Sequence, residues 1–334
     1  MLGTVRDTRQ IHPMVMDYRM PDAIENLSDL IADQGDGREF FARNYVTQGM
    51  EALFREGLLR LSGRSDQAAF ELAQAMGGGK THLMIAFGLL ARHPHLRPEV
   101  LPADLAAQLD FGPARIAAFN GRNDPDHYVW GELAEQIGQA ELIRPYWADG
   151  LGGVDEAKWM QIIGDEPILI LLDELPPYLL NASTRGVGKG SLADVVTYSL
   201  SNLLTAALKL PRCCVVIANL SGSYDRQTED LARIVSDLQQ ETRRQAVSIT
   251  PVQLAGSQIY AILKKRLFTQ IAGATVIDSV AEAYAEQVKA AEEAAKSWRR
   301  IRAPEKVAPL LAGTRYEDGI PVTDDPPETQ REAA

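Results

Sequence analysis

A run of five branched apolar residues, Ile168–Leu172, constrains the fold more than any other feature of this sequence, and it ends abruptly at Asp173 and Glu174. No polar residue interrupts the run at alternate positions, so it fits a strand that is buried on both faces. Strands of that kind occur in parallel sheets that helices cover on both sides. The run therefore predicts a central strand that carries two acids at its carboxyl end.

Four further apolar runs have the length of strands, and helical patterns lie between them. Strands are predicted at Ala68–Ala73, Ala114–Phe119, Cys213–Ala218 and Ala246–Ile249, and helices at Lys80–Arg92, Val129–Ile137, Ser191–Leu208 and Asp225–Arg243. Strands that alternate with helices are typical of an α/β fold with a parallel sheet. We therefore expect a five-stranded parallel sheet sandwiched by helices.

The segments on either side of this core have helical or irregular patterns. Helices are expected over Asp22–Ala32 and Asn44–Leu61 before the core, and over Ser257–Phe268 and Ile277–Arg300 after it. The last stretch is rich in proline and acids, a composition typical of disorder. The predicted organisation is an N-terminal helical segment at residues 1–66, a core at 67–255, a partial helical lid at 256–301 and a disordered tail at 302–334.

Charge and cysteine usage exclude several classes of protein. The formal charge is −11, from 34 basic and 45 acidic residues, which argues against a protein that coats nucleic acid through its net field but leaves a local basic face open. Cys213 and Cys214 are adjacent, with no metal-ligand spacing around them, which argues against a structural disulfide or a zinc site. Residues 1–20 carry charges throughout, and no apolar run approaches the length of a membrane span. We expect a cytoplasmic protein with no membrane partner.

A glycine-rich loop joins the first predicted strand to the first helix of the core, and it reads Gly77-Gly78-Gly79-Lys80-Thr81. Glycines let successive backbone N–H groups turn toward one anion, and the start of a helix adds the positive end of its dipole. In phosphate-binding loops the lysine contacts the β- and γ-phosphates and the Ser/Thr hydroxyl ligates Mg²⁺. The sequence therefore predicts a site for ATP and Mg²⁺. The predicted nucleotide-binding residues are Gly77, Gly78, Gly79, Lys80, Thr81 and His82.

The loop as a whole and His82 each have an alternative interpretation. Gln74 stands where the usual pattern has its first glycine, so the alternative for the loop is a glycine-rich turn followed by an unrelated Lys-Thr pair. His82 falls inside the predicted helix, where packing or capping is the alternative to a role at the nucleotide.

The acids after the central strand have the chemistry that such a loop requires. Asp173 is predicted to hold Mg²⁺ together with Thr81, and Glu174 is predicted to polarise the attacking water as the general base. Solvated loop acids are the alternative interpretation. The order of the motifs, with the glycine-rich loop upstream, favours the catalytic one.

Two further positions are candidates for catalysis. Asn219 follows the predicted strand Cys213–Ala218 and is expected to orient the water, with Ser221 as a rival and a chain-turning asparagine as the alternative. Arg243 and Arg244 close a polar helix before the last strand, where one of them is predicted to reach the γ-phosphate in a neighbouring subunit. The alternative is that they balance the helix dipole. An arginine that contacts the γ-phosphate bound by a neighbouring subunit implies a homo-oligomer.

Two other patterns invite a functional reading that the sequence does not favour. Arg185–Ser191 looks like a second phosphate loop, but Gly190 replaces the required Ser/Thr, and we expect a mobile loop that contacts a partner. Asp124, Asp126 and His127 could be drawn as a metal cluster, but a turn is the better interpretation.

The motifs in this order resemble the AAA+ branch of P-loop ATPases, and several segments resemble an uncharacterised family of large bacterial ATPases encoded beside DNA methyltransferases and helicases in anti-phage loci. Those segments are Ile11–Pro13, Phe40–Gly49, Met76–His82, Trp130–Leu133, Leu171–Leu175 and Ile259–Phe268. The resemblance implies a P-loop NTPase core, ATP and Mg²⁺ as ligands, and the roles given above for Lys80, Thr81, Asp173, Glu174, Asn219 and Arg243 or Arg244. The sequence departs from the pattern at Glu71, inside the strand before the loop, and it shows no second-sensor arginine, as if the lid were truncated.

Three functions follow as hypotheses. The first is an ATP-hydrolysing motor or switch subunit that acts with DNA, or with DNA-modification or helicase proteins, in anti-phage defence. The second is an interaction module that binds ATP with little turnover, which the missing lid favours. The third, a small-molecule kinase, requires an arginine-rich lid that the sequence lacks.

Overall fold

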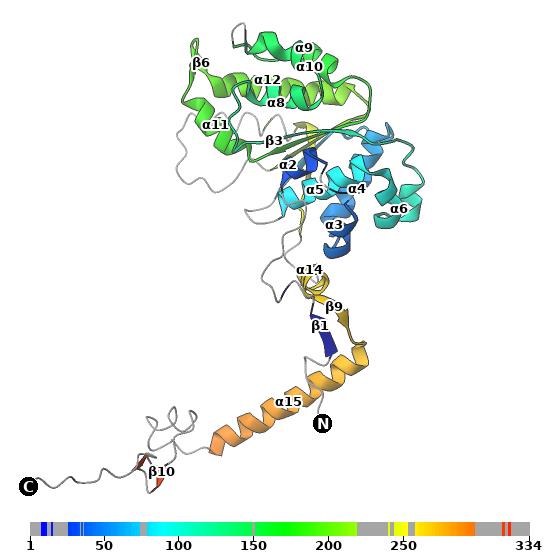
Figure 1. Ribbon diagram of the computed structural model, residues 1–334, viewed down its shortest axis with the longest axis vertical. Coiled ribbons are helices and arrows are strands. Elements are labelled where there is room, and N and C mark those ends of the chain that lie inside the picture. The colour runs from blue at the N-terminus through cyan, green and yellow to red at the C-terminus, as the bar shows by residue number, and fades with distance from the viewer. Residues whose placement is uncertain are drawn as a thin grey trace, which may run out of the picture. The chain divides into compact units, whose positions relative to one another are not determined.

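The computed structural model describes residues 8–11, 15, 26–33, 35, 37–73, 79–148, 151–218, 240, 244–252, 258–297, 316–317 and 320–321 (Figure 1). Contacts divide the chain into two compact units. One is Gln10–Gln270, and the other is Met1–Arg9 together with Ile271–Ala334. Nearly all of the predicted helix Asp225–Arg243 and of the predicted tail lies outside the described residues.

The larger unit contains the predicted five-stranded parallel sheet, in the order β3-β4-β7-β2-β8. Its strands are β2 (Ala69–Leu72), β3 (Arg115–Asn120), β4 (Ile168–Asp173), β7 (Cys213–Ala218) and β8 (Ala246–Ile249). Each lies within one residue of its predicted bounds. Every residue of β4 is buried, as its uninterrupted apolar sequence predicted for a strand covered on both faces.

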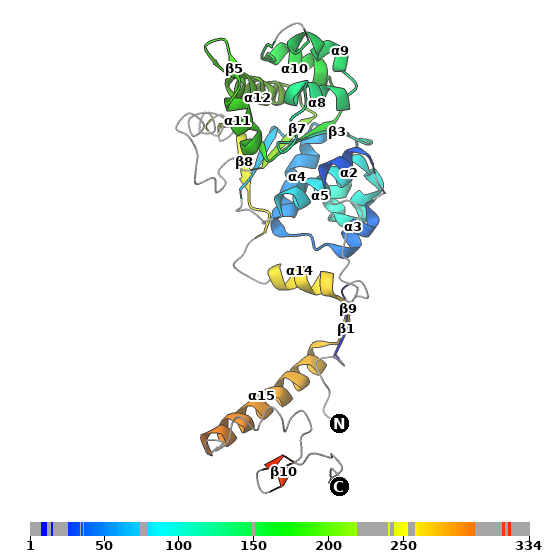
Figure 2. The same ribbon diagram turned by 60° about the vertical axis from the view of Figure 1, so that its left-hand side comes forward.

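Helices α8, α10, α11 and α12 cover one face of the sheet (Figure 2). Alternate β4 residues such as Ile168 and Ile170 pack in the core beneath these helices. The largest buried side chains of this core are Trp130, Trp159 and Tyr178. The bounds of the helices are α8 (Tyr128–Gln136), α10 (Glu156–Ile163), α11 (Leu175–Ser183) and α12 (Leu192–Lys209). The short α9 (Ala140–Ile143) follows α8.

The N-terminal helices cover the other face and share one core with the sheet. The remaining β4 residues, Leu169 and Leu171, pack in this core with Phe54 of α4 and Phe87 of α5. The elements of this layer are α2 (Leu27–Ile31), α3 (Arg38–Arg43), α4 (Gln48–Leu61), α5 (Lys80–Arg92), α6 (Arg97–Val100) and α7 (Ala103–Ala106). The helical segment before the sheet therefore forms one layer of the fold together with α5, α6 and α7, which follow β2.

A buried arginine ties these layers together. Arg60, in the last turn of α4, is 3% exposed, and its guanidinium donates hydrogen bonds to five backbone oxygens. The acceptors are the carbonyls of Ser65, Ala207, Leu208, Leu210 and Cys213. Arg60 thereby satisfies carbonyls at the end of α12, which have no partners within that helix.

The segment predicted as a mobile loop forms an antiparallel hairpin, and its mobility and its contact with a partner stay predictions. Strands β5 (Gly186–Val187) and β6 (Gly190–Ser191) pair across a two-residue turn. Gly188 in that turn has φ +58°, in the left-handed region that hairpin turns require and glycine adopts readily. Ser191 then caps α12.

Short strands and two helices complete the described part of the chain. They are β1 (Arg9–Ile11), which pairs with β9 (Phe268–Ile271), then α14 (Gln258–Leu267), α15 (Ala274–Ser297), and the β10 (Tyr316–Glu317) and β11 (Ile320–Pro321) ladder. No helix within the described residues combines the length and apolar composition that a membrane crossing requires.

Candidate functional site

The candidate site lies where β2 and β4 end. The two strands are parallel, with β7 between them, so their carboxyl ends meet at one edge of the sheet. The helix after β2, α5, packs on one face, and the helices after β4, α11 and α12, pack on the other. A crevice at the carboxyl ends of the strands is where ligands bind in open α/β sheets of this kind.

Thr81 and Asp173 meet at this edge. Thr81 lies in the first turn of α5, and its hydroxyl Oγ1 donates to Oδ2 of Asp173, the last residue of β4, at 2.5 Å. The structure therefore brings together the two residues that the sequence predicted as a metal pair.

Asp173 is a buried acid, 2% exposed. Its other oxygen, Oδ1, accepts a hydrogen bond from the backbone N–H of Glu174 at 2.9 Å. Burial raises the pKa of Asp173, while the hydrogen bonds from Thr81 and Glu174 and the positive charge of Lys80 oppose that rise. The arrangement offers oxygen ligands only, which suits a hard cation such as Mg²⁺.

Glu174 has an unusual backbone. Its φ is +49°, a region that non-glycine residues enter rarely and that is often associated with functional sites. It directly precedes α11, which begins with Leu175 and two prolines. Its carboxylate accepts a hydrogen bond from Nε of Arg122 and forms an ion pair with it.

Arg122 stands in a turn that is fastened to the end of β4. Asn120 of β3 lies directly opposite Asp173, and Gly121 N–H donates to the Asp173 carbonyl at 2.9 Å. A Cβ on Gly121 would lie 2.0 Å from the Glu174 carbonyl oxygen, so only glycine fits there. The Asn120 side chain accepts from Arg122 N–H at 3.0 Å, which fixes the turn.

The start of α5 has the geometry expected after a glycine loop. Gly79 has φ +79° and precedes Lys80, and its carbonyl accepts the hydrogen bond of Leu83 N–H at 2.9 Å. His82 stacks on Phe40 of α3, with ring centroids 4.6 Å apart. This packing contact is the alternative that the sequence left open for His82.

Of the predicted site positions, five lie outside the described residues and one lies at the other edge of the sheet. Gly77, Gly78, Asn219, Ser221 and Arg243 lie outside the described residues. Arg244 is exposed and precedes β8, so it lies at the amino-terminal edge of the sheet, opposite the edge that carries Lys80.

The turn after β3 holds no metal cluster. Asp124 accepts hydrogen bonds from Asn181 at 2.8 Å and from Arg185 at the base of the hairpin. Among the described residues, no group of three or more His, Cys, Asp and Glu side chains could hold a metal ion.

Arg122 is the site residue that sequence reasoning missed. Its role depends on β3 lying next to β4, which places the residue after one strand beside the acids after the other. The only signal available was that a polar, charged turn follows a predicted strand.

Comparison with known proteins gives one finding. Residues 8–101 match the DUF499 N-terminal domain, a region that includes Lys80 and Thr81 but neither Asp173 nor Glu174. The match covers less than a third of the chain. No curated protein matches the sequence.

Proposed function

We propose that this chain binds ATP at the carboxyl edge of its sheet and hydrolyses it, as an AAA+ type motor or switch subunit. The observation that carries the proposal is the contact between Thr81 and Asp173, which places a hydroxyl and a buried carboxylate together beside Lys80. The coarser finding, a five-stranded parallel sheet with helices on both faces, is compatible with a P-loop-like core.

The start of α5 supplies the phosphate contacts in this proposal. The first N–H groups of a helix have no partners within it, and the helix dipole makes this end attractive to anions. Lys80, at the first position of α5, adds a positive charge on a flexible stem. Together they bind the terminal phosphates of the nucleotide.

Thr81 Oγ1 and the Asp173 carboxylate fit Mg²⁺, because both are oxygen donors and already lie within hydrogen-bond distance of each other. When bound, the ion neutralises charge that develops on the phosphate oxygens. Burial disfavours the charged form of Asp173, so a nearby cation stabilises the ionised carboxylate.

Glu174 is the general base of the proposal. It adjoins the metal-binding acid and directly precedes α11 at the same edge of the sheet. A carboxylate there accepts a proton from the attacking water and orients it toward the γ-phosphate. Arg122 holds Oε2 of Glu174 and fixes the direction of the carboxylate, so we infer that turnover rises when the pair opens and the carboxylate can turn toward the water.

The ion pair of Arg122 and Glu174 also favours the second candidate, a nucleotide-gated interaction module with little turnover. In that module the base stays paired and hydrolysis is slow. The two candidates share the binding site and differ only in whether Glu174 is released.

The wider setting is part of the proposal. We infer a cytoplasmic protein that works with DNA or DNA-associated proteins in anti-phage defence, on the resemblance described above and the partial DUF499 match. The two buried, unpaired cysteines, Cys213 and Cys214, are compatible with a reducing compartment. Because Arg244 lies at the far edge of the sheet, we infer that it could reach a γ-phosphate only in a second copy of the chain, as part of a homo-oligomer.

Single-turnover phosphate release, measured with and without DNA, tests the hydrolase. We expect Glu174→Gln to keep ATP affinity and to lose about a hundredfold in rate or more, as removal of a general base does. Glu141→Gln, which removes an equal charge from an exposed site on α9, is the matched control and should match the wild type. Undiminished hydrolysis in Glu174→Gln rules out the assigned base, and ATP binding without release favours the interaction module.

A further inference from the structure

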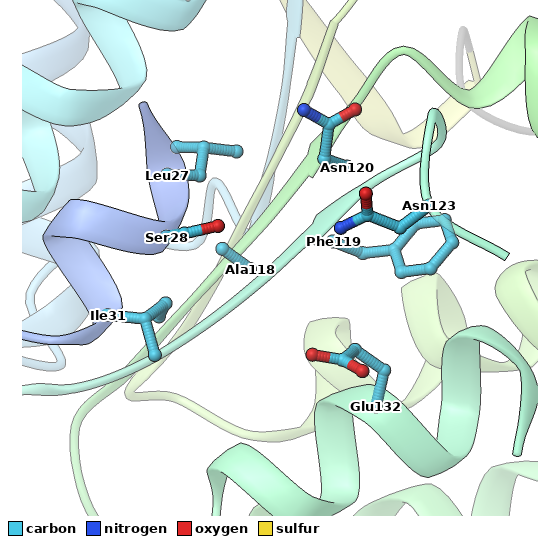
Figure 3. A pocket seen from close by; sticks show the side chains of 8 residues that line it. All are labelled: Leu27, Ser28, Ile31, Ala118, Phe119, Asn120, Asn123 and Glu132. Atoms are coloured by element: carbon cyan, nitrogen blue, oxygen red, sulfur yellow. The ribbon is translucent and has the colours of Figure 1, made fainter. Parts of the chain in front are cut away.

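A recess opens at the outer edge of β3, between α2 and α8, and nothing described so far uses it. The recess is open to solvent, and its volume of about 290 Å³ counts the solvent-filled space at its mouth. Its lining residues are Leu27, Ser28, Ile31, Ala118, Phe119, Asn120, Asn123 and Glu132 (Figure 3). Figure 3 shows the Ser28 hydroxyl and the Glu132 carboxylate turned toward the same open space.

The lining selects one ligand chemistry. Glu132 is the one ionisable residue in the lining, so the recess favours a cation. Its Oε1 accepts from Gln136 at 2.7 Å, but its Oε2 lies 3.4 Å from His127 Nε2, longer than a good hydrogen bond. A carboxylate with one oxygen so placed has room to accept a further donor.

The apolar part of the lining suits a short hydrocarbon stem. Leu27 and Ile31 of α2 lie on the same side of β3 as Ala118, whereas the Phe119 side chain points to the opposite side, into the core beneath α8 (Figure 3). Alkylammonium groups combine such a stem with a charged head, and they bury the stem while the head keeps polar partners. Ser28 and Asn123 add neutral hydrogen-bonding groups for the remaining N–H donors of the head.

We propose that this recess is an effector site for an alkylammonium group, from a small amine or from a lysine side chain, and that its occupancy controls Glu174. The coupling rests on the proposed hydrolase function, whereas the binding does not. The connection is the turn after β3. Asn120 and Asn123 line the recess, and the Asn120 side chain holds the N–H of Arg122, whose guanidinium pairs with Glu174.

A ligand that contacts Asn120 or Asn123 therefore acts on the residue that restrains the base. Asn123 N–H also donates to the Asn120 carbonyl at 2.9 Å, which links the two lining asparagines within the turn. Displacing it releases the Glu174 carboxylate for the attacking water. Occupancy of the recess is expected to raise turnover.

Binding is tested first, by calorimetry or NMR titration of the full chain with n-butylammonium chloride, with 1-butanol as the uncharged control. We expect saturable binding in the millimolar range for an ion of this size, and none for butanol. Glu132→Gln should weaken the affinity at least about tenfold, since it removes the charge partner. Glu135→Gln removes the same charge from an exposed position on α8 outside the lining, and should bind as the wild type does.

A second variant guards against loss of fold. Ser28 is exposed on α2, so Ser28→Phe fills the recess without disturbing the core, and it should abolish binding while the melting temperature stays near that of the wild type. No saturable binding, or equal weakening by Glu132→Gln and Glu135→Gln, overturns the site. Two further ligands, compared with butylammonium, decide the source of the group. Tighter binding of Nα-acetyl-lysine amide assigns it to a protein side chain, and tighter binding of spermidine assigns it to a small amine.

Coupling is tested by the rate of ATP hydrolysis at saturating butylammonium. We expect a several-fold rise that Ser28→Phe removes. Binding with an unchanged rate overturns the coupling and keeps the site. A chain that binds butylammonium but hydrolyses no ATP under any condition contradicts the proposed hydrolase, not the recess.

Discussion

Gly121 and Glu174 approach each other so closely that a methyl group on Gly121 would lie 2.0 Å from the carbonyl oxygen of Glu174. The contact joins the turn after β3 to the residue that directly precedes α11. It holds Arg122 beside the Glu174 carboxylate, although the two residues are far apart in the sequence.

Replacing Gly121 by alanine should force these two segments apart. The clash is with backbone, which cannot rotate away, so we expect a loss of about 1–3 kcal/mol in the free energy of unfolding, as in other overpacked sites. Urea denaturation measures it. Gly112→Ala is the matched control, because a Cβ on Gly112 would meet no atom within 4 Å, and it should change stability by less than about 1 kcal/mol. Equal stability of the two variants would show that the turn accommodates a side chain.

Removing the Arg122 side chain should free Glu174. The pair is partly exposed, with side chains 60% and 38% exposed, so its contribution is at most about 1 kcal/mol. We expect Arg122→Ala to raise kcat for ATP by about fivefold or less and to leave the KM unchanged. Arg144→Ala, which breaks an exposed pair with Glu141, should leave the kcat unaltered. A fall in kcat comparable to that of Glu174→Gln would mean that Arg122 assists the reaction.

Arg60 should matter for stability far more than its neighbour Arg64. Replacing the buried Arg60 by methionine leaves carbonyls at the end of α12 and the start of β7 without their hydrogen-bond donor. We expect the free energy of unfolding to fall by about 3 kcal/mol or more. The Arg64 side chain is 49% exposed and paired with Asp110, so the same change at Arg64 should lower the free energy of unfolding by at most about 1 kcal/mol. Thermal and urea denaturation of both variants measure the difference. Similar losses would show that the buried hydrogen bonds add little.

The sheet could be predicted from the sequence because its strands are buried on both faces. Ile168–Leu172 and Cys213–Ala218 have no polar residue in them, so each of these strands can be predicted from its own sequence without knowledge of its neighbours. The helix α11 was missed because Pro176 and Pro177 look like a break, although proline is tolerated in the first turn of a helix, where its missing N–H has no partner to lose.

The candidate site was only partly predictable. Thr81 and Asp173 could be predicted as partners because the glycine-rich loop and the acids after a buried strand each indicate a Mg²⁺ ligand. The structure places the two residues in contact. Arg122 was not found, since its contact with Glu174 depends on the order of strands in the sheet, which short apolar runs do not encode. The hairpin at residues 186–191 was not predicted because strands of two residues leave no periodic pattern.

The affinity for ATP in the presence of Mg²⁺, compared between the wild type and Lys80→Ala, tests the central claim most directly. We predict saturable binding by the wild type, weakened at least about tenfold by loss of the ammonium group. Lys209→Ala removes a lysine at the end of α12 that pairs with Glu156, and should bind ATP as the wild type does. Equal affinity of the wild type and Lys80→Ala, or no binding by either, would contradict the account.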